Sequence, residues 1–166
     1  MTINPGLVFG PNLNKAQFSS GDVVKRIMMN DFPGMPKVQL PTVDVRDVAQ
    51  AHLAAIQIPE AANQRFILCA ESAWFKDYGV WLDEVYGKKG SKKYKVVTSE
   101  LPKLLCQIVA FFDKEIKTIM PFWGIEKYFD NTTTKEVLKI DFIPAKQSIQ
   151  DMAVTLIETG YIPDKR

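Results

Sequence analysis

Two aspartates, Asp44 and Asp47, stand three residues apart in the segment Val-Asp-Val-Arg-Asp. Two carboxyl groups at that spacing could work as a general acid and a general base. Both residues also stand where a helix is predicted to begin, so Asp44 can cap its first turn and Asp47 can interact with the positive end of the helix dipole. We therefore interpret the two aspartates as structural rather than catalytic.

The single histidine, His52, excludes any metal site that needs several histidines. It falls among the apolar positions of the same predicted helix, which indicates a buried histidine with a hydrogen-bond partner rather than a ligand or a base. Cys69 and Cys106 lie far apart in the chain, without CxxC or zinc-like spacing, and each belongs to an apolar run. We predict two buried, reduced thiols in a cytoplasmic protein, and no metal ligands.

The composition is that of a globular domain. Of the 166 residues, 46% are hydrophobic and 24% are charged, and 21 basic against 19 acidic side chains leave a net charge of +2. These values exclude a disordered chain, a fibrous repeat and a disulfide scaffold, and the even charge argues against a nucleic-acid binder or a polybasic membrane-binding segment. Charged residues interrupt the most apolar stretch, 101–120, so no membrane span is predicted, and the first residues do not resemble a signal peptide.

Apolar periodicity and turn residues predict alternating strands and helices. Pro41 suggests that the second strand is irregular or lies at a sheet edge. Gly160 follows the last predicted helix at a position that favours a positive φ. The basic segment 88–93 is interpreted as a solvated loop. The order of elements indicates an α/β fold with a helix-rich second half, with strands at 2–9, 38–43, 65–70 and 94–97, and helices at 22–30, 44–58, 74–86, from 101, from 133 and from 148.

The first strand poses a problem for an independent fold. Its apolar residues suggest that both faces are covered, as in a parallel sheet, which requires neighbouring strands on either side. Only two other good strands are found, both short, and a parallel sheet of three strands is a poor independent fold. We therefore expect that the partner strands lie in a segment that this chain lacks.

Four segments resemble the extended short-chain dehydrogenase/reductase superfamily, which includes the NAD-dependent epimerases and dehydratases. The segment TINPGLVFGPN at residues 2–12 is similar to the superfamily's NPGxVxGP, and VDVRDVAQAH at 43–52 is similar to its VDVRDVAxAH. Residues 65–68 match the strand that follows this segment in the family. Residues 128–138 and 149–162 resemble the two segments that close the family's sequence pattern. The nearest branch holds dihydroflavonol-4-reductase, cinnamoyl-CoA reductase and methylglyoxal reductase. The segments match the C-terminal half of the family's usual length.

The resemblance implies a partial Rossmann-like parallel sheet, containing only the late strands, with a helix-rich substrate-binding part. Residues 1–70 would hold the late Rossmann strands and helices with a substrate loop, and residues 71–166 would hold mostly substrate-side and C-terminal helices. The N-terminal dinucleotide-binding half would be absent from residues 1–166.

In the family, two functional motifs lie in that other half. A glycine-rich turn binds the pyrophosphate of the cofactor, and a Tyr-x-x-x-Lys pair carries out proton transfer. No glycine-rich turn of that pattern is found here. Tyr161 and Lys165 match the pair by letter, but Pro163 between them breaks a helix, so the two side chains cannot share one helical face. We predict no catalytic residue in this chain.

The resemblance also implies cofactor contacts. The backbone of Pro5, Gly6 and Leu7 would line the nicotinamide end of NADP or NAD, because glycine permits close approach of the backbone. Ser20 falls where reductases of this branch place a serine near the cofactor. Without the pyrophosphate turn, we expect the chain alone to bind no cofactor.

Two hypotheses on function remain open. In the first, this is the C-terminal part of a reductase that moves a hydride between NADP(H) or NAD(H) and a carbonyl or alcohol on a small, fairly apolar substrate, with no nucleic-acid or membrane partner. In the second, the chain is a non-catalytic scaffold or assembly subunit that pairs with another chain through the edge of strand 2–9.

Overall fold

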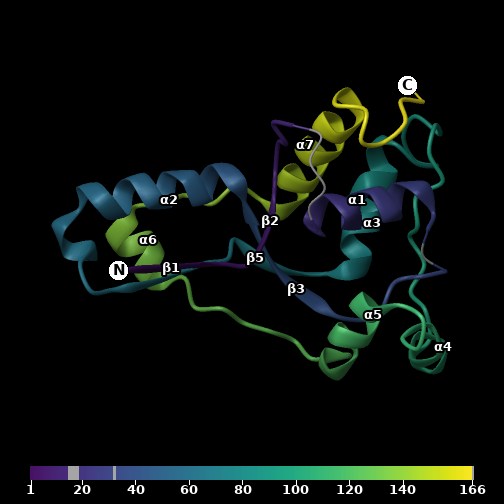
Figure 1. Cartoon of the computed structure of the whole chain (residues 1–166), viewed down its shortest axis with the longest axis horizontal. Helices are drawn as coiled ribbons and strands as arrows, with labels where there is room; N and C mark the ends of the chain where they lie inside the picture. Colours follow the sequence, from purple (N-terminus) through teal and green to yellow (C-terminus); the bar gives the residue numbers. More distant parts are fainter. Residues whose placement is uncertain (15–18, 32, 166) are drawn as a thin grey trace.

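The computed structural model describes residues 1–14, 19–31 and 33–165 of the chain. Figure 1 shows an elongated α/β molecule, with β1, α2 and α6 at one end and α1, α3, α4 and α5 at the other. The predicted mixture of a parallel sheet with many helices is confirmed. The helices are α1 (Ser19–Met29), α2 (Val45–Gln57), α3 (Phe75–Val85), α4 (Lys103–Val109), α5 (Lys114–Ile119), α6 (Thr132–Leu138) and α7 (Ala145–Glu158), with 3-10 turns η1 (Pro59–Ala61) and η2 (Met120–Phe122).

The strands form two small sheets. Strand β1 (Thr2–Pro5) pairs in parallel with β4 (Arg65–Leu68). Strand β2 (Leu7–Phe9) pairs in parallel with β3 (Gln39–Asp44), and β3 also pairs antiparallel with β5 (Glu71–Trp74). Among the described residues β1 has a strand partner on one side only.

The prediction of one strand over residues 2–9 is wrong, because the structure divides it at Gly6. Pro5 is opposite Leu68 in the first sheet, whereas Leu7 is opposite Thr42 in the second. The Gly6 N–H donates a hydrogen bond of 2.9 Å to the Leu68 carbonyl. Gly6 is therefore the point at which the chain leaves one sheet and enters the other.

The prediction of an edge position for Pro41 is also wrong. Strand β3 lies between β2 and β5, and Pro41 is opposite Ser72 of β5. Strand β5 was not predicted, because its four residues directly precede the helix α3 and were in part assigned to that helix. The antiparallel pairing with β3 makes this segment extended despite its lack of a long apolar run.

The second half differs from its predicted elements. Residues 94–97 form no strand, and the single helix predicted from residue 101 is divided into α4, α5 and η2. The Asp113 carboxylate accepts a hydrogen bond of 3.2 Å from the Ile116 N–H, which caps a new helix start. Helix α7 begins before Ser148, whose hydroxyl donates to the Pro144 carbonyl instead of capping.

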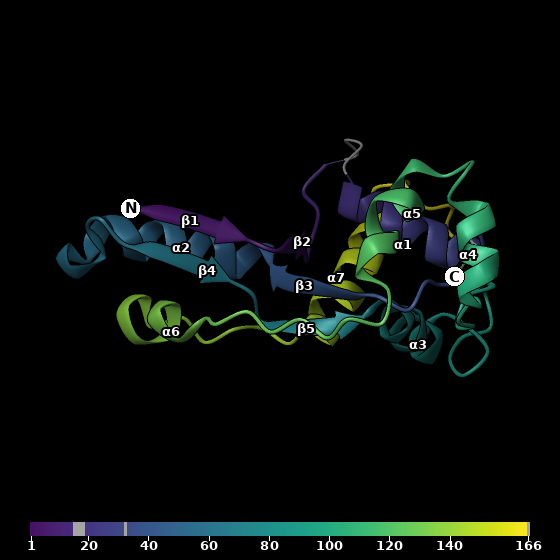
Figure 2. The same cartoon turned by 90° about the horizontal axis from the view of Figure 1, so that it is seen from below.

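Two apolar cores hold these elements together. The larger core joins α1, α3 and α7 to one face of β2, through Phe9, Tyr78 and Leu156. The smaller one packs Phe66 and Leu68 of β4 against α2 and α6. Helix α2 runs along one side of the β1–β4 pair and α6 lies beside β4 (Figure 2).

Local predictions have mixed outcomes. Gly160 has a φ angle of 71°, as predicted, and Lys139, which stands where the resembled family usually has a glycine, also has a positive φ of 56°. Cys69 and Cys106 are buried free thiols, also as predicted. The burial predicted for His52 is wrong, because the buried stripe of α2 runs through Asp47, Ala51 and Ala55 and leaves His52 exposed. The hydrogen-bond partner predicted for His52 is present, because its Nδ1 lies 2.8 Å from the Val48 carbonyl oxygen. In the described part of the chain, no helix combines the length and apolar content that crossing a membrane requires.

Candidate functional site

The bend from β1 to β2 forms the centre of the candidate site. Pro5 ends β1 at the level of Leu68, the last residue of β4, and the next residues turn toward β3. This bend therefore lies at the carboxyl ends of two parallel strands, between two sheets. In open α/β folds, ligands bind beyond the carboxyl ends of parallel strands where neighbouring strands diverge.

Gly6 is required by the sheet itself. A Cβ atom at this position would lie 2.6 Å from the Pro41 carbonyl oxygen and 2.9 Å from its carbon. The absent side chain thus lets β2 approach β3 closely. The resemblance implies that glycine allows close approach of a cofactor. The structure adds a second reason, which is the close packing of β2 against β3.

An apolar cavity of about 280 Å³ opens beside the bend. Leu7, directly after Gly6, forms part of its wall. The rest of the wall comes from α1, β3, α3 and α5, so residues far apart in sequence enclose one space. Six of its eight lining residues are apolar, and the two others carry hydroxyl groups; the set is Leu7, Ser19, Val23, Leu40, Phe75, Ile116, Thr118 and Ile119.

The two hydroxyl groups of this cavity differ in their surroundings. The Thr118 hydroxyl donates a hydrogen bond of 2.9 Å to the Lys114 carbonyl of its own helix. Ser19 is the first residue of α1 and is exposed. An exposed hydroxyl at the edge of an apolar cavity can orient a polar group of a small ligand, while the apolar wall holds the remainder.

The structure separates Ser20 from this cavity. Ser20 is 8% exposed and lines a second, smaller cavity of about 190 Å³ with Phe9, Gly10 and Met152. Of the four predicted cofactor residues, only Leu7 borders the 280 Å³ cavity, while Pro5 and Gly6 form the bend beside it. Sequence reasoning missed Ser19, although its spacing to Val23 places both on one face of α1 and could have indicated it.

The aspartate pair is structural, as we interpreted it. Asp44 is fully buried and accepts the Arg46 N–H at 2.8 Å, which caps α2. The Arg46 guanidinium binds both Asp44 oxygens at 2.8 Å and also Asp151 of α7 at 2.7 Å. Burial raises the pKa of Asp44, but hydrogen bonds from Arg46 and Ser148 outweigh it and hold the pKa below its usual value.

Asp47 has the opposite electrostatics. Its carboxylate is 1% exposed and accepts the Ile143 N–H at 3.0 Å. Burial raises its pKa above the usual range, and the negative charge of Asp44 acts in the same direction. One aspartate thus links α2 to α7 and the other links α2 to the segment before α7, so neither is available to a substrate.

Tyr161 and Lys165 do not form a proton-transfer pair. The Tyr161 hydroxyl donates to Asp22 of α1, and this hydrogen bond raises the pKa of Tyr161 to about 12. The Lys165 ammonium lies over the ring of Tyr94, 5.4 Å from the ring centroid. Both residues follow the end of α7, so they share no helical face.

The described residues also bring together no group of three or more His, Cys, Asp or Glu side chains that could hold a metal ion.

Comparison with known proteins identifies relatives, although no protein-family model matches the chain. A Saccharomyces cerevisiae protein named as an oxidoreductase is 29% identical over 170 residues, which cover 95% of this chain and 42% of the relative. A Candida albicans protein named as an NADPH-dependent methylglyoxal reductase is 31% identical over 161 residues, which cover 93% and 42%. The chain thus spans less than half the length of these curated relatives.

Solved structures share the fold. Yeast methylglyoxal/isovaleraldehyde reductase, solved with NADPH, superposes with a TM-score of 0.69 at 23% identity, over 96% of this chain and 47% of that one. A nucleoside-diphosphate-sugar epimerase from Pseudomonas aeruginosa superposes with a TM-score of 0.73 at 15% identity, over 96% and 48%. The chain is therefore similar to the C-terminal part of these reductases and has the fold of the corresponding part of the solved reductase and epimerase.

Proposed function

We propose that this chain is the C-terminal part of a cytoplasmic, NADP(H)-dependent reductase that acts on a carbonyl, or the corresponding alcohol, of a small and fairly apolar compound. The observation that carries the proposal is the position of the 280 Å³ apolar cavity directly beside the Pro5–Gly6–Leu7 bend. A ligand site at the carboxyl ends of parallel strands thus adjoins a space suited to an apolar substrate.

The bend fits one end of the cofactor. It combines an exposed proline, a glycine without a side chain and a leucine that faces the cavity, so a flat ring could lie against the backbone. NADP(H), when bound, supplies or accepts the hydride of the reaction. Pro5, Gly6 and Leu7 would hold its nicotinamide end, with Ser20 contributing from α1. The pyrophosphate has no glycine-rich turn here and would need residues outside this chain.

The apolar wall of the cavity would serve the substrate. Leu40 of β3 and Phe75 of α3 line the cavity together with Ile116 and Ile119 of α5. Such a wall excludes water from the carbonyl and holds the substrate by burial of apolar surface. Ser19 is the side chain placed to select a polar substituent.

The preference for NADP(H) draws on two relatives. The Candida albicans relative is named as NADPH-dependent, and the yeast reductase was solved with NADPH. Both are similar to this chain, and the larger share of their length lies outside the matched part.

A chimera tests the proposal. The N-terminal half of the Candida albicans relative, joined in frame ahead of Thr2, should fold cooperatively and consume NADPH in the presence of small branched or aromatic aldehydes. Ile119→Trp, at a cavity residue with no proposed cofactor contact, should fill the cavity and abolish turnover while NADPH binding persists. Leu53→Trp, at an exposed position of α2, is the matched control and should leave turnover unchanged.

A folded chimera that binds NADPH but reduces no aldehyde or ketone would refute the enzymatic proposal. The remaining alternative, a scaffold that pairs through the open edge of β1, would then be the better explanation.

A further inference from the structure

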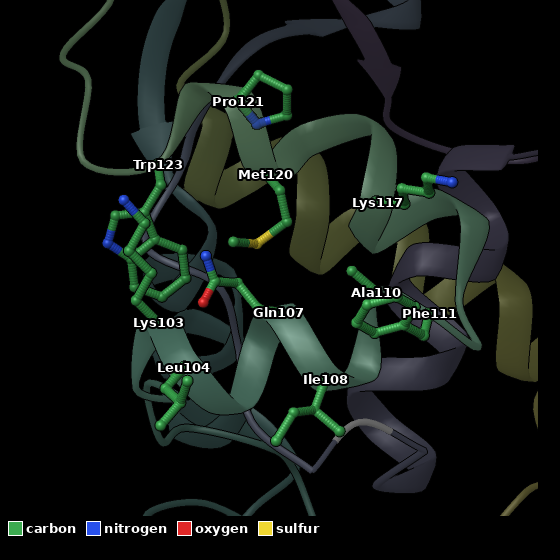
Figure 3. A pocket seen from close by; sticks show the side chains of 10 residues that line it. All are labelled: Lys103, Leu104, Gln107, Ile108, Ala110, Phe111, Lys117, Met120, Pro121 and Trp123. Atoms are coloured by element: carbon green, nitrogen blue, oxygen red, sulfur yellow. The ribbon is translucent and has the colours of Figure 1, made fainter.

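A groove of about 750 Å³ lies between α4 and the α5–η2 segment. Its wall is mainly apolar, with Leu104 and Ile108 from α4 and Met120 and Trp123 from the opposite side. Figure 3 shows these side chains facing one space, with Met120 and Gln107 near the middle of the groove. The groove lies at the end of the molecule far from β1 and β4 (Figure 1).

The surroundings of this groove are unusually apolar for a surface. Leu104, Ile108 and Phe111 are 70%, 51% and 86% exposed, and Phe112 next to them is 89% exposed. Cys106 is the only buried residue of α4. Contiguous exposed apolar side chains of this kind mark an interaction surface, because leaving them in water costs free energy that a partner can recover.

The charges around the groove select the chemistry of that partner. Lys103 of α4 and Lys117 of α5 both line the groove and lie on opposite sides of the group of lining residues in Figure 3. No carboxylate is among the described residues that line the groove. The carboxylate of Asp113, in the turn between α4 and α5, forms an ion pair with Arg26 of α1. Both ends of the groove therefore favour negative charge.

We propose that this groove binds an amphipathic helix of a partner protein that carries an acidic residue at each end of its apolar stripe. The walls are themselves helical, so a third helix can pack its apolar stripe between α4 and η2, as in other helix-in-groove complexes. Lys103 and Lys117 then pair with the two acidic residues and set the position of the helix along the groove. This inference does not depend on the proposed reductase function.

Two designed peptides test it on the chain itself. Each is a helix of about 15 residues, a length at which helices become marginally stable in water, with leucines at i, i+3, i+4 and i+7. One peptide carries glutamates at both ends of the stripe, and its twin carries lysines there. Trp123 lines the groove, so its fluorescence reports binding, with Trp74 and Trp81 outside the groove as background.

The glutamate peptide should bind about tenfold more tightly than its lysine twin, and the difference should shrink at high salt. The charge reversal Lys103→Glu with Lys117→Glu should invert the preference between the two peptides. Loss of folding would weaken the binding of both peptides alike, so it cannot account for an inverted preference.

A matched pair of variants locates the site. Ile108→Ser with Phe111→Ser should abolish binding of the glutamate peptide. Leu53→Ser with Ile56→Ser removes an equally exposed apolar pair, 61% and 76% exposed on α2, and should not change binding. Equal affinity for the two peptides would overturn the proposal. So would self-association of the chain that Ile108→Ser with Phe111→Ser abolishes, because the occupant would then be a second copy.

Discussion

The backbone of Pro41 approaches Gly6 so closely that a Cβ atom on Gly6 would lie 2.6 Å from the Pro41 carbonyl oxygen. This contact joins the bend of the candidate site to the central strand of the three-stranded sheet. Because Pro41 lies in the interior of β3, its carbonyl cannot move without shifting the pairing of β3 with β5. The shape of the candidate site is thus tied to the register of the sheet.

Gly6→Ala should therefore destabilise the fold by about 1–3 kcal/mol, the usual cost of overpacking. Urea unfolding followed by circular dichroism would measure the loss. Gly124→Ala is the control, because a Cβ there meets no atom within 4 Å and only its φ of 70° opposes the change, at a cost of about 1 kcal/mol. A fully stable Gly6→Ala variant would contradict the close contact.

Asp44→Asn should lower the free energy of unfolding by about 1–3 kcal/mol at neutral pH, because it removes the charge that Arg46 binds while it keeps an oxygen to cap α2. Asp44→Ala should cost about 1 kcal/mol more, because it also loses the cap. The pKa of Asp44 is lowered on folding, so its carboxylate stabilises the protein above the unfolded pKa of about 3.9. This contribution is lost as the pH falls through the lower, folded pKa.

Denaturation of the parent and Asp44→Asn proteins over a pH series would check both statements. The gap between the two should close in acid, as the parent carboxyl group becomes protonated. A gap that is constant with pH would show that the charge of Asp44 plays no part.

Asp47→Asn should have the opposite pH dependence. Burial raises the pKa of Asp47 on folding, so ionisation of this carboxyl group destabilises the fold as the pH rises from about 4 through the folded value. An asparagine oxygen can still accept the Ile143 N–H and carries no charge. The variant should gain stability relative to the parent as the pH increases, whereas Asp47→Ala should lose stability at every pH. Thermal unfolding at several pH values measures this, and a parallel pH profile for parent and Asp47→Asn would count against a raised pKa.

NADPH added to the purified chain should not raise its Tm. A ligand at 100 times its Kd would stabilise the folded state by about 2.7 kcal/mol, which thermal shift detects readily. The chain offers the bend at Pro5–Gly6–Leu7 but no glycine-rich turn for the pyrophosphate, where much of the binding would arise. The chimera described above serves as the positive control. A clear increase in Tm for the chain alone would reveal a cofactor site that we have not recognised.

Local features could be read from the sequence because they depend on a few neighbouring residues. The cap of α2 by Asp44, the positive φ at Gly160 and the burial of both cysteines all follow from residue type and immediate context. The resemblance to the reductase superfamily could likewise be identified, because it depends on the order and spacing of short segments.

The shape of the site required the tertiary structure. The division of the first strand at Gly6 depends on Pro41 and Leu68, which are distant in sequence, and the short strand β5 exists because β3 lies beside it. The cavity combines Leu7 and Ser19 with α5 side chains, while Ser20 faces a different space. The sequence alone determined the family resemblance and the local caps, because these are encoded in short segments. Only the tertiary structure decided which strands pair and which side chains share a cavity, because those contacts join segments whose mutual positions no local pattern specifies.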